Sequence, residues 1–221
     1  GKRATRIAEQ MNGTQQMGEG RRITDAETLK IVTMVYAGYI NKNIVAQLQT
    51  QNCNAIGITG ADGNAILAHK RVHATMDYGF VGDVDKVNAE FFKNLLEQNI
   101  TPIIAPITHD KKGQLLNTNA DTIAQETAKA LSSFFDVQLI YSFEKDGVLL
   151  DVNDPSSVVK KLNPNYYSEL KQKGSIFAGM IPKLDNAFTA LNSGVKKIII
   201  GKAEEIDALI KGEKGTSITN E

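Results

Sequence analysis

The chain has 221 residues, of which 42% are hydrophobic, and its 25 basic and 25 acidic residues cancel to a formal net charge of zero. Such a chain can bury a substantial core, and no overall field draws it to nucleic acid or to an anionic membrane. These properties favour a small-molecule partner. The single cysteine, Cys53, excludes an internal disulfide, and the apolar runs are far shorter than a bilayer requires. We therefore expect a soluble protein of the cytoplasm.

Residues 24–48 carry the signals of a long helix. Thr24 and Glu27 have the spacing of a capping box, in which the threonine side chain accepts an amide hydrogen bond and the glutamate reaches back to the threonine amide. Apolar residues then recur three and four positions apart, at Leu29, Val32, Tyr36, Ile40 and Ile44. We expect a helix from Thr24 to about Leu48.

Strands and helices alternate along the rest of the chain. The predicted strands span residues 55–59, 101–105, 137–142 and 196–201, and the predicted helices span residues 88–98, 121–134, 183–192 and 203–211. This order favours an α/β fold, with a largely parallel sheet between layers of helices. We find no flexible linker, so any division into two lobes is tight, and we place it near residues 106–114.

Several familiar chemistries have no signature in the sequence. Residues 212–216 have the wrong spacing for a phosphate-binding P-loop, and no Gly-x-Gly-x-x-Gly stands between a strand and a helix. The histidines His69, His73 and His109 lack the spacing of a metal site, and we interpret the first two as solvated loop residues. No serine or cysteine has the context of a nucleophile. The sequence predicts neither a metal-ligand cluster nor a covalent mechanism.

Two short segments combine side chains in ways that suit a polar ligand. Asn117, Asn119 and Asp121 occupy alternate positions before a predicted helix, so an extended segment would point all three the same way. The alternative interpretation is a loop whose Asn or Asp caps the helix. Lys183 follows Gly179 and a proline that suits the first turn of a helix, although taken alone it would be a solvated surface lysine.

Taken in order, these segments resemble the acetylglutamate kinase branch of the amino-acid kinase family. The resemblance covers nearly the whole chain, and each motif is weak alone but specific as a member of the ordered set. The motifs are residues 20–29 (GRRITDAETL), 37–42 (AGYINK), 78–84 (YGFVGDV), 102–107 (PIIAPI), 117–121 (NTNAD) and 179–183 (GMIPK). The resemblance implies a three-layer α/β sandwich with a mainly parallel open sheet. It also implies one domain with an acylglutamate-binding lobe, about residues 1–110, and an ATP-binding lobe, about residues 111–221.

The same resemblance implies which residues bind the acyl amino acid. Arg22 would clamp a substrate carboxylate with its planar guanidinium, a geometry that lysine does not offer. Asn117 and Asn119 would hold the substrate. Gly1 would be the last glycine of a Gly-Gly-Gly loop whose amides face the transferred phosphoryl group.

The resemblance further implies the catalytic and nucleotide-binding residues. Lys183 would neutralise charge on the phosphates, and Asp121 would orient the lysines of the site. The nucleotide would contact Ser142, Gly147, Gly179 and Lys183.

The implied reaction transfers a phosphoryl group from ATP, with Mg²⁺ as the second cofactor, to the side-chain carboxylate of N-acetyl-L-glutamate. It is the second step of arginine biosynthesis. A carboxylate with a pKa of about 4.3 is already ionised at neutral pH, so no general base is required. Catalysis would consist of aligning two anions and screening their repulsion, and Asp121 would organise the site rather than remove a proton.

The sequence departs from the family pattern in two places. The family has a Lys-x-Gly-Gly strand upstream of the position that Gly1 occupies, and we expect such a segment to be missing here, because the chain opens directly on helical spacing. In residues 141–149 the family more often has an aspartate where this chain has Phe143, which affects the expected nucleotide contacts near Ser142. Residues 215–218 resemble the closing motif of the family, either as a strand at a sheet edge or as packing beside the nucleotide.

Alternatives stay open at this point. A larger, acid-bearing acyl group such as succinyl would need one more cationic or amide contact, for which Arg21 is a candidate. Aspartate kinase and glutamate kinase are alternatives within the superfamily, and a non-catalytic ligand-binding or regulatory relative is the alternative from another class. The resemblance implies a homodimer or a higher homo-oligomer, with contacts through the helix at residues 24–48, and no nucleic-acid or membrane partner.

Overall fold

The computed structural model describes residues 17–18, 21–176 and 178–220, which form two compact units. Unit 1 is residues 1–123 and unit 2 is residues 124–221. Each unit has its own sheet and core, and each is described by itself. No helix in the described part of the chain has both the length and the apolar character needed to cross a membrane.

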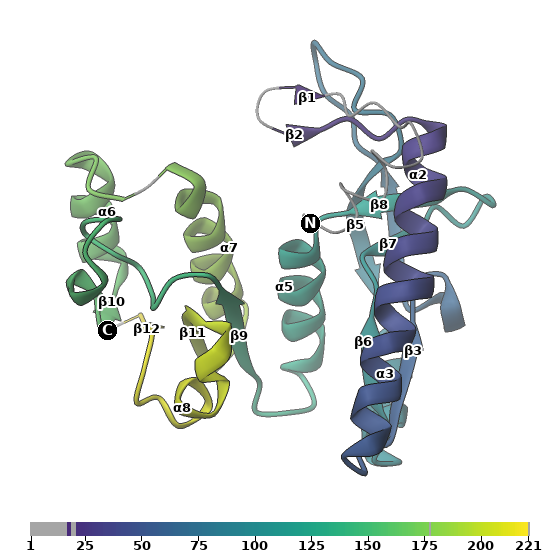
Figure 1. Cartoon of the computed structure of the whole chain (residues 1–221). Coiled ribbons are helices and arrows are strands. Elements are labelled where there is room, and N and C mark those ends of the chain that lie inside the picture. The colour runs from purple at the N-terminus through teal and green to yellow at the C-terminus, as the bar shows by residue number, and fades with distance from the viewer. Residues whose placement is uncertain (1–16, 19–20, 177, 221) are drawn as a thin grey trace. The chain divides into compact units, whose positions relative to one another are not determined.

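Unit 1 combines a long helical rod, made of the consecutive segments α2, η1 and α3, with three small groups of strands (Figure 1). Its helical segments are α2 (Ala26–Thr33), the π-helix η1 (Met34–Ile40), α3 (Asn41–Thr50), the 3₁₀ turn η2 (Asp62–Asn64) and α4 (Ala89–Glu97). Its strands are β1 (Met17–Gly18), β2 (Arg21–Arg22), β3 (Ala55–Ile58), β4 (Ile66–Lys70), β5 (Val81–Val87), β6 (Thr101–Ile104), β7 (Ile107–His109) and β8 (Leu115–Thr118). Strands β3 and β6 pair in parallel, and β4, β5, β8 and β7 close into a small barrel.

The rod of unit 1 packs its apolar stripe against the barrel and its far end against β3 and β6. Leu29 and Val32 of α2 form a buried cluster with Ile107 of β7. Further along the rod, α3 contacts β3 and β6. Burial of these apolar side chains is the main force that holds the rod in place.

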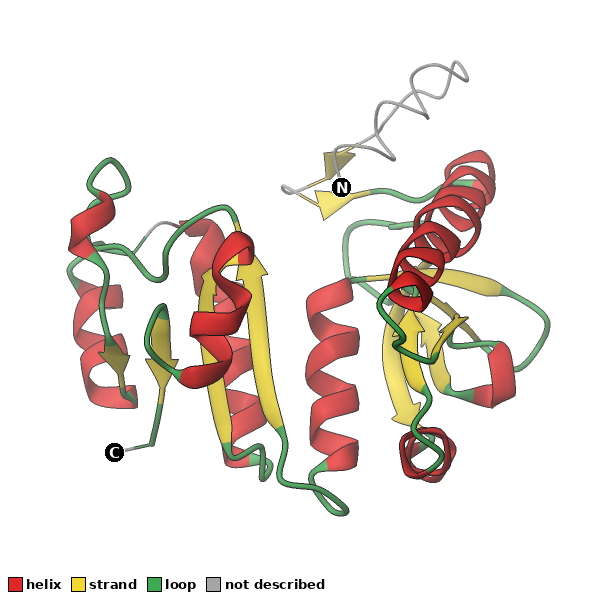
Figure 2. Cartoon of the chain, turned by 60° about the horizontal axis from the view of Figure 1, so that its bottom comes forward, coloured by secondary structure: helices red, strands yellow, loops and turns green. Residues whose placement is uncertain are grey.

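Unit 2 is a four-stranded sheet with helices on both faces (Figure 2). The sheet order is β10 (Lys161–Leu162), β12 (Thr216–Ile218), β11 (Lys197–Lys202) and β9 (Gln138–Phe143). The helical segments are α5 (Ala120–Leu131), which starts in unit 1, followed by η3 (Pro155–Ser157), α6 (Pro164–Gln172), η4 (Ala178–Met180), α7 (Ile181–Asn192), η5 (Ala203–Glu205) and α8 (Ile206–Lys211).

The core of unit 2 follows from the alternation of side chains along β11. Ile198 and Ile200 point to one face, where they pack with Leu184 of α7. Ile199 points to the other face, on which α8 lies and buries Leu209. A strand buried on both faces reads as a continuous apolar run, which is why residues 198–200 are all isoleucine.

The helices and strands predicted from periodicity are confirmed, with boundaries that differ by at most three residues, and the α/β class is confirmed with them. The long helix is interrupted by the π-helix η1, which the sequence analysis did not predict. The predicted capping box was wrong in both halves. The carboxylate of Asp25, not the hydroxyl of Thr24, caps α2 by accepting a hydrogen bond from the Thr28 amide at 2.7 Å. The Thr24 amide donates to the Tyr78 carbonyl, and Glu27 accepts a hydrogen bond from the Lys30 ammonium.

Three further details differ from the sequence analysis. His69 is not a loop residue but lies in β4, where its Nδ1 is 2.6 Å from Oδ1 of Asp85. Strand β12 is not at the edge of its sheet, because β10 and β11 flank it. Helix α6 was not predicted, although Asn163 and Pro164 form a recognisable start: the asparagine side chain accepts a hydrogen bond from the Tyr166 amide.

Candidate functional site

Thr24 lies where three segments of unit 1 meet. Its amide donates a hydrogen bond to the Tyr78 carbonyl at 3.0 Å, and its carbonyl accepts one from the Phe80 amide at 2.7 Å. Its buried Oγ1 accepts a hydrogen bond from Nδ2 of Asn117 at 3.0 Å. The backbone amide of Asn117 in turn donates a hydrogen bond to the Phe80 carbonyl at 2.8 Å. These bonds join three segments: the residues before α2, residues 78–80 before β5, and strand β8.

The predicted polar cluster of residues 117–121 divides into two roles. Asn117 lies in the extended strand β8, and its side chain is half-buried. Asn119 is exposed and caps α5, because its Oδ1 accepts hydrogen bonds from the amides of Asp121 at 2.8 Å and Thr122 at 3.2 Å. Asp121 lies in the first turn of α5. The helix-cap interpretation is therefore confirmed for Asn119, whose side-chain NH₂ group takes no part in this cap.

Of the predicted substrate residues, the structure describes only the backbone of Arg22 and does not describe Gly1. Arg22 lies in β2, which pairs with β1, and Met17 is opposite Arg22. Nothing of the Arg22 side chain is described, and Gly1 lies outside the described residues. Their predicted roles stay predictions.

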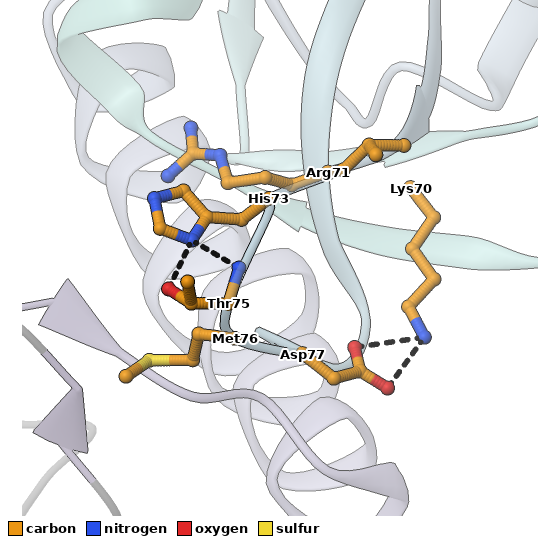
Figure 3. Close-up of a pocket in the computed structure, with 7 residues that line it drawn as sticks. Lys70, Arg71, His73, Thr75, Met76 and Asp77 are labelled. Carbon is orange, nitrogen blue, oxygen red and sulfur yellow. Dashed lines mark hydrogen bonds and ion pairs between the residues drawn. The ribbon is translucent and has the colours of Figure 1, made fainter.

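A pocket of about 450 Å³ lies beside this junction, within the connection between β4 and β5 (Figure 3). It is lined by Lys70, Arg71, Val72, His73, Thr75, Met76 and Asp77. The lining is basic, but the side chains of Lys70 and Arg71 are both paired with carboxylates. The Lys70 ammonium is 3.0 Å from Oδ1 of Asp77, and the Arg71 guanidinium binds both oxygens of Asp83.

These ion pairs join the β4–β5 connection to the two strands it links, through Lys70 of β4 and Asp83 of β5. The hydrogen bond from Lys70 lowers the pKa of the Asp77 carboxyl, and the bond to Asp83 raises the pKa of the Arg71 guanidinium. Oδ1 of Asp77 also accepts a hydrogen bond from the Gly79 amide at 2.8 Å. Since Gly79 bridges to Thr24, the pocket wall continues into the junction that holds Asn117.

In unit 2, Lys183 lies in the first turn of α7, with its ammonium nitrogen 5.9 Å from the centroid of the Tyr141 ring. Tyr141 is buried in β9. The contact is a cation–π interaction, which limits where the ammonium group can lie. No side chain caps the amino end of α7, but η4 leads directly into it and Pro182 has no amide N–H. The positive charge that this helix start offers to a phosphate is therefore mainly that of Lys183.

The other predicted nucleotide residues also lie in unit 2. Ser142 is exposed near the carboxyl end of β9, opposite Gly201 of β11, and Gly179 is exposed in η4 just before α7. Because β9 and β11 are parallel, their carboxyl ends lie at one edge of the sheet, where α/β proteins bind ligands. Gly147 is buried, and a Cβ there would lie 2.7 Å from Oγ1 of Thr216, so packing by itself requires glycine.

Helix α7 is braced from the side by α6. The Tyr167 hydroxyl donates a hydrogen bond to Oδ1 of Asp185 at 2.7 Å, and its ring stacks on Phe188 at 5.2 Å between centroids. Burial, followed by the bond to Asp185, raises the pKa of the Tyr167 hydroxyl. The tyrosine therefore stays protonated and keeps donating, which holds the start of α7 and with it Lys183.

Sequence reasoning missed two residues of these clusters. Tyr141 has no local signal beyond its place in an alternating strand, and Thr24 was assigned to the helix cap. Their partners, Lys183 and Asn117, are 42 and 93 positions away in the sequence. Only the tertiary structure brings these pairs together.

An α/β fold with a lysine in the first turn of a helix, beside the ends of parallel strands, is typical of nucleotide-dependent transferases. The model of the amino acid kinase family matches residues 1–202. The structure of carbamate kinase from Giardia lamblia bound to AMP-PNP superposes with a TM-score of 0.60 at 14% identity, covering 87% of this chain and 71% of that one. This likeness supports the fold alone. The chain belongs to the amino acid kinase family.

Sequence identity narrows the assignment within the family. The acetylglutamate kinase of Phocaeicola vulgatus is 57% identical over 207 residues, which cover 94% of this chain and 80% of that protein. The acetylglutamate kinase of Cytophaga hutchinsonii is 57% identical over 215 residues, covering 97% and 81%. These relatives place the chain in the acetylglutamate kinase branch, as the ordered motifs predicted.

Proposed function

We propose that this protein transfers the terminal phosphoryl group of ATP to the side-chain carboxylate of N-acetyl-L-glutamate, in the second step of arginine biosynthesis. The observation that carries the proposal is the 57% identity to acetylglutamate kinases over 94% of the chain. The geometry of the two units supports it, because unit 1 holds Asn117 in a defined orientation and unit 2 presents Lys183 on an uncapped helix terminus.

The acylglutamate would bind in the amino-terminal lobe, predicted at about residues 1–110, with the start of the second lobe. We assign Arg22 to a substrate carboxylate, Asn117 and Asn119 to the polar groups of the substrate, and Gly1 to the amide loop that faces the transferred group. The Thr24 bond to Asn117 supports this assignment, because an amide held by a buried hydroxyl can present its remaining polar atoms in one direction.

ATP would bind in the carboxy-terminal lobe, predicted at about residues 111–221. Lys183 would bind phosphate oxygens, with Ser142, Gly147 and Gly179 around the nucleotide and Asp121 orienting the charged groups. Helix α7 supports this arrangement, because it places Lys183 in its first turn, at the positive end of the helix dipole. When bound, Mg²⁺ would screen phosphate charge.

The described residues contain no group of three or more His, Cys, Asp or Glu able to hold a metal by itself. This fits a Mg²⁺ ion bound mainly through phosphates and water, as in other nucleotide enzymes. The acceptor carboxylate is ionised at neutral pH, so the chain's residues need only align the two anions and offset their repulsion.

The acyl group, the assembly and the location are finer proposals. Acetyl is the acyl group we propose, and succinyl is the alternative that a substrate panel must include. We propose that the protein forms a homodimer, or a higher oligomer built from such dimers. Three large apolar side chains along the rod support this assembly, because they are exposed and a second copy could cover them: Met34, Tyr39 and Ile44, which are 42–56% exposed. Sedimentation velocity tests this assembly.

A cytoplasmic location is supported by the lone Cys53 and by the use of ATP.

The test is phosphoryl transfer from Mg-ATP by the purified protein, with the acyl phosphate trapped as a hydroxamate. Acetylglutamate, succinylglutamate, glutamate and aspartate are compared in parallel. We expect turnover of acetylglutamate and a loss of about 10²–10³-fold in kcat for Lys183→Ala, because the charge that stabilises the phosphoryl group is removed.

Lys173→Ala is the matched control, since Lys173 is an exposed lysine of unit 2 whose ammonium pairs with Glu169. It should leave kcat unchanged. Turnover of glutamate or aspartate alone would move the protein to another branch of the family, and no turnover of any acceptor would favour the non-catalytic relative.

A further inference from the structure

Thr24 is a polar residue that is fully buried, with a relative exposure of 0%. It does not cap the helix that follows it, because Asp25 has that role. A buried hydroxyl is unfavourable unless it is hydrogen-bonded, so the partner of this hydroxyl identifies what the residue does. That partner is the side-chain amide of Asn117, 93 residues later in the chain.

The hydrogen bond determines the orientation of the Asn117 amide. Nδ2 donates to Oγ1 of Thr24 at 3.0 Å, which restricts rotation of the amide plane. An asparagine amide has a second N–H donor and an acceptor oxygen, and both lie in that plane. Their directions are therefore set before any ligand arrives, and this pre-organisation lowers the cost of ordering the side chain on binding.

The backbone of Thr24 adds a second connection between the same segments. The backbone amide of Thr24 donates to the Tyr78 carbonyl, and the Thr24 carbonyl accepts from the Phe80 amide. The Phe80 carbonyl accepts a hydrogen bond from the backbone amide of Asn117. Gly79, between them, has φ +68°, and a Cβ there would lie 2.1 Å from the Thr24 carbonyl oxygen. The close approach of the two chains thus depends on glycine, and it keeps Thr24 at a constant position relative to Asn117.

We propose that Thr24 is a positioning residue for the acyl amino acid, acting through Asn117 and through the chain that carries Arg22 two residues earlier. This inference rests on the proposed function, since it assumes that Asn117 contacts the acylglutamate. Thr24 itself touches no substrate. Its hydroxyl presents the amide, and its backbone bridge holds the amino end of the substrate-binding segment.

The decisive variant is Thr24→Val, which keeps the shape of threonine and removes the hydroxyl. We expect the KM for acylglutamate to rise about tenfold, because the amide is no longer held in its binding orientation, and the KM for ATP to change less than twofold. Thr24→Ser restores a hydroxyl and should return the acylglutamate KM to within about threefold of wild type. If Thr24→Val does not fold, Thr24→Ala, which adds no apolar group, takes its place.

Thr108→Val is the matched control, because Thr108 is also fully buried in unit 1 and its Oγ1 bonds to Oγ1 of Thr118 at 2.8 Å. Thr118 is next to Asn117 in β8, so its side chain points to the opposite face of the strand from the Asn117 amide. It should lower stability without changing either KM. In the double variant Thr24→Val/Asn117→Ala, the acylglutamate KM should equal that of Asn117→Ala alone, because Thr24 acts through the amide that is now absent.

Three outcomes would overturn the inference: an unchanged acylglutamate KM in Thr24→Val, an equal rise in both KM values, or full additivity in the double variant. Acylglutamate affinity is also measured by calorimetry without ATP, which separates the two proposals. Wild-type protein that binds acylglutamate but transfers no phosphoryl group would overturn the proposed reaction, while a weaker affinity in Thr24→Val would still support the positioning role. Wild-type protein that neither binds nor phosphorylates acylglutamate would overturn both.

Discussion

Asp25 shows how a single side chain determines where the long helix begins. Its backbone is extended, and its carboxylate accepts a hydrogen bond from the Thr28 amide, one of the amides that a helix leaves without an internal partner. That bond holds the pKa of the Asp25 carboxyl below its ordinary value of 3.8. A carboxyl with a lowered pKa in the folded state stabilises the fold above its unfolded pKa and loses this effect as the pH falls.

We therefore expect Asp25→Ala to lower the free energy of unfolding by about 1 kcal/mol at pH 7. The difference from wild type should shrink as the pH falls below 3.8, because the wild-type carboxylate becomes protonated there. Urea unfolding at pH 7 and at two pH values below 3.8 measures both quantities. Asp25→Asn, which keeps an acceptor oxygen, should stay close to wild type at pH 7; equal losses for Asn and Ala would show that the cap is not the cause.

At the scale of elements, the rod of unit 1 is held to its sheet by polar bonds as well as by apolar packing. Asn41 is buried at the start of α3, and its Nδ2 donates to the Ile103 carbonyl of β6 at 2.7 Å. The Lys42 ammonium donates to the Gly57 carbonyl of β3 at 2.7 Å. Both residues follow the π-helix η1, whose wider turn changes the angular register of the residues after it. The rod thus bonds to two neighbouring parallel strands.

The bridge between Gly79 and Thr24 gives a prediction at the same scale. Gly79→Ala should lower the free energy of unfolding by about 2–3 kcal/mol, because alanine is strained at φ +68° and its Cβ meets the Thr24 carbonyl. Gly174→Ala is the control: Gly174 has φ +64° with nothing within 4 Å of the added Cβ, so only the backbone cost of about 1 kcal/mol should remain.

Urea unfolding of the two glycine variants compares them directly. Equal losses would mean that the contact with Thr24 contributes nothing beyond backbone conformation. A larger loss for Gly79→Ala, together with a raised KM for acylglutamate, would connect the bridge to the substrate site.

At the scale of the whole molecule, the chain divides its predicted tasks between two compact units. Unit 1 contains the junction of Thr24 and Asn117 and the basic pocket of the β4–β5 connection. Unit 2 contains the parallel strand ends of β9 and β11 and the uncapped start of α7. Each unit has its own buried apolar cluster.

Hydrogen exchange with each ligand added separately tests this division. Acylglutamate should protect residues 78–80 and 115–119 of unit 1, and AMP-PNP should protect residues 142–147 and 178–185 of unit 2. Ligand at about 100 times its Kd stabilises the bound state by about 2.7 kcal/mol, which is enough for a clear slowing of exchange. Helix α4 should be unaffected by either ligand. Protection of the unit 1 segments by AMP-PNP alone would contradict the assignment of the two lobes.

The sequence by itself determined the helices and strands with strong periodicity, the α/β class and the family. Periodicity reports which face of an element is buried, and this is a local property that a window of ten residues contains. The family motifs lie where elements begin or end, and one of them contains a backbone conformation that favours glycine, at Gly79 with φ +68°. The glycine-punctuated strand β5 and the short strands β4, β8 and β10 were missed, because brief or irregular strands have weak local patterns.

Only the tertiary structure decided which partners the functional residues have. The sequence predicted that Thr24 caps a helix, because threonine before a helix often has that role. In the structure Thr24 is buried against the chain that leads into β5 and against β8, and its hydroxyl accepts a hydrogen bond from Asn117. Tyr141 looked like one apolar residue among several until α7 placed Lys183 over its ring. Hydrogen bonds and cation–π contacts between residues tens of positions apart leave no trace in local periodicity, because the chain between them determines whether they meet.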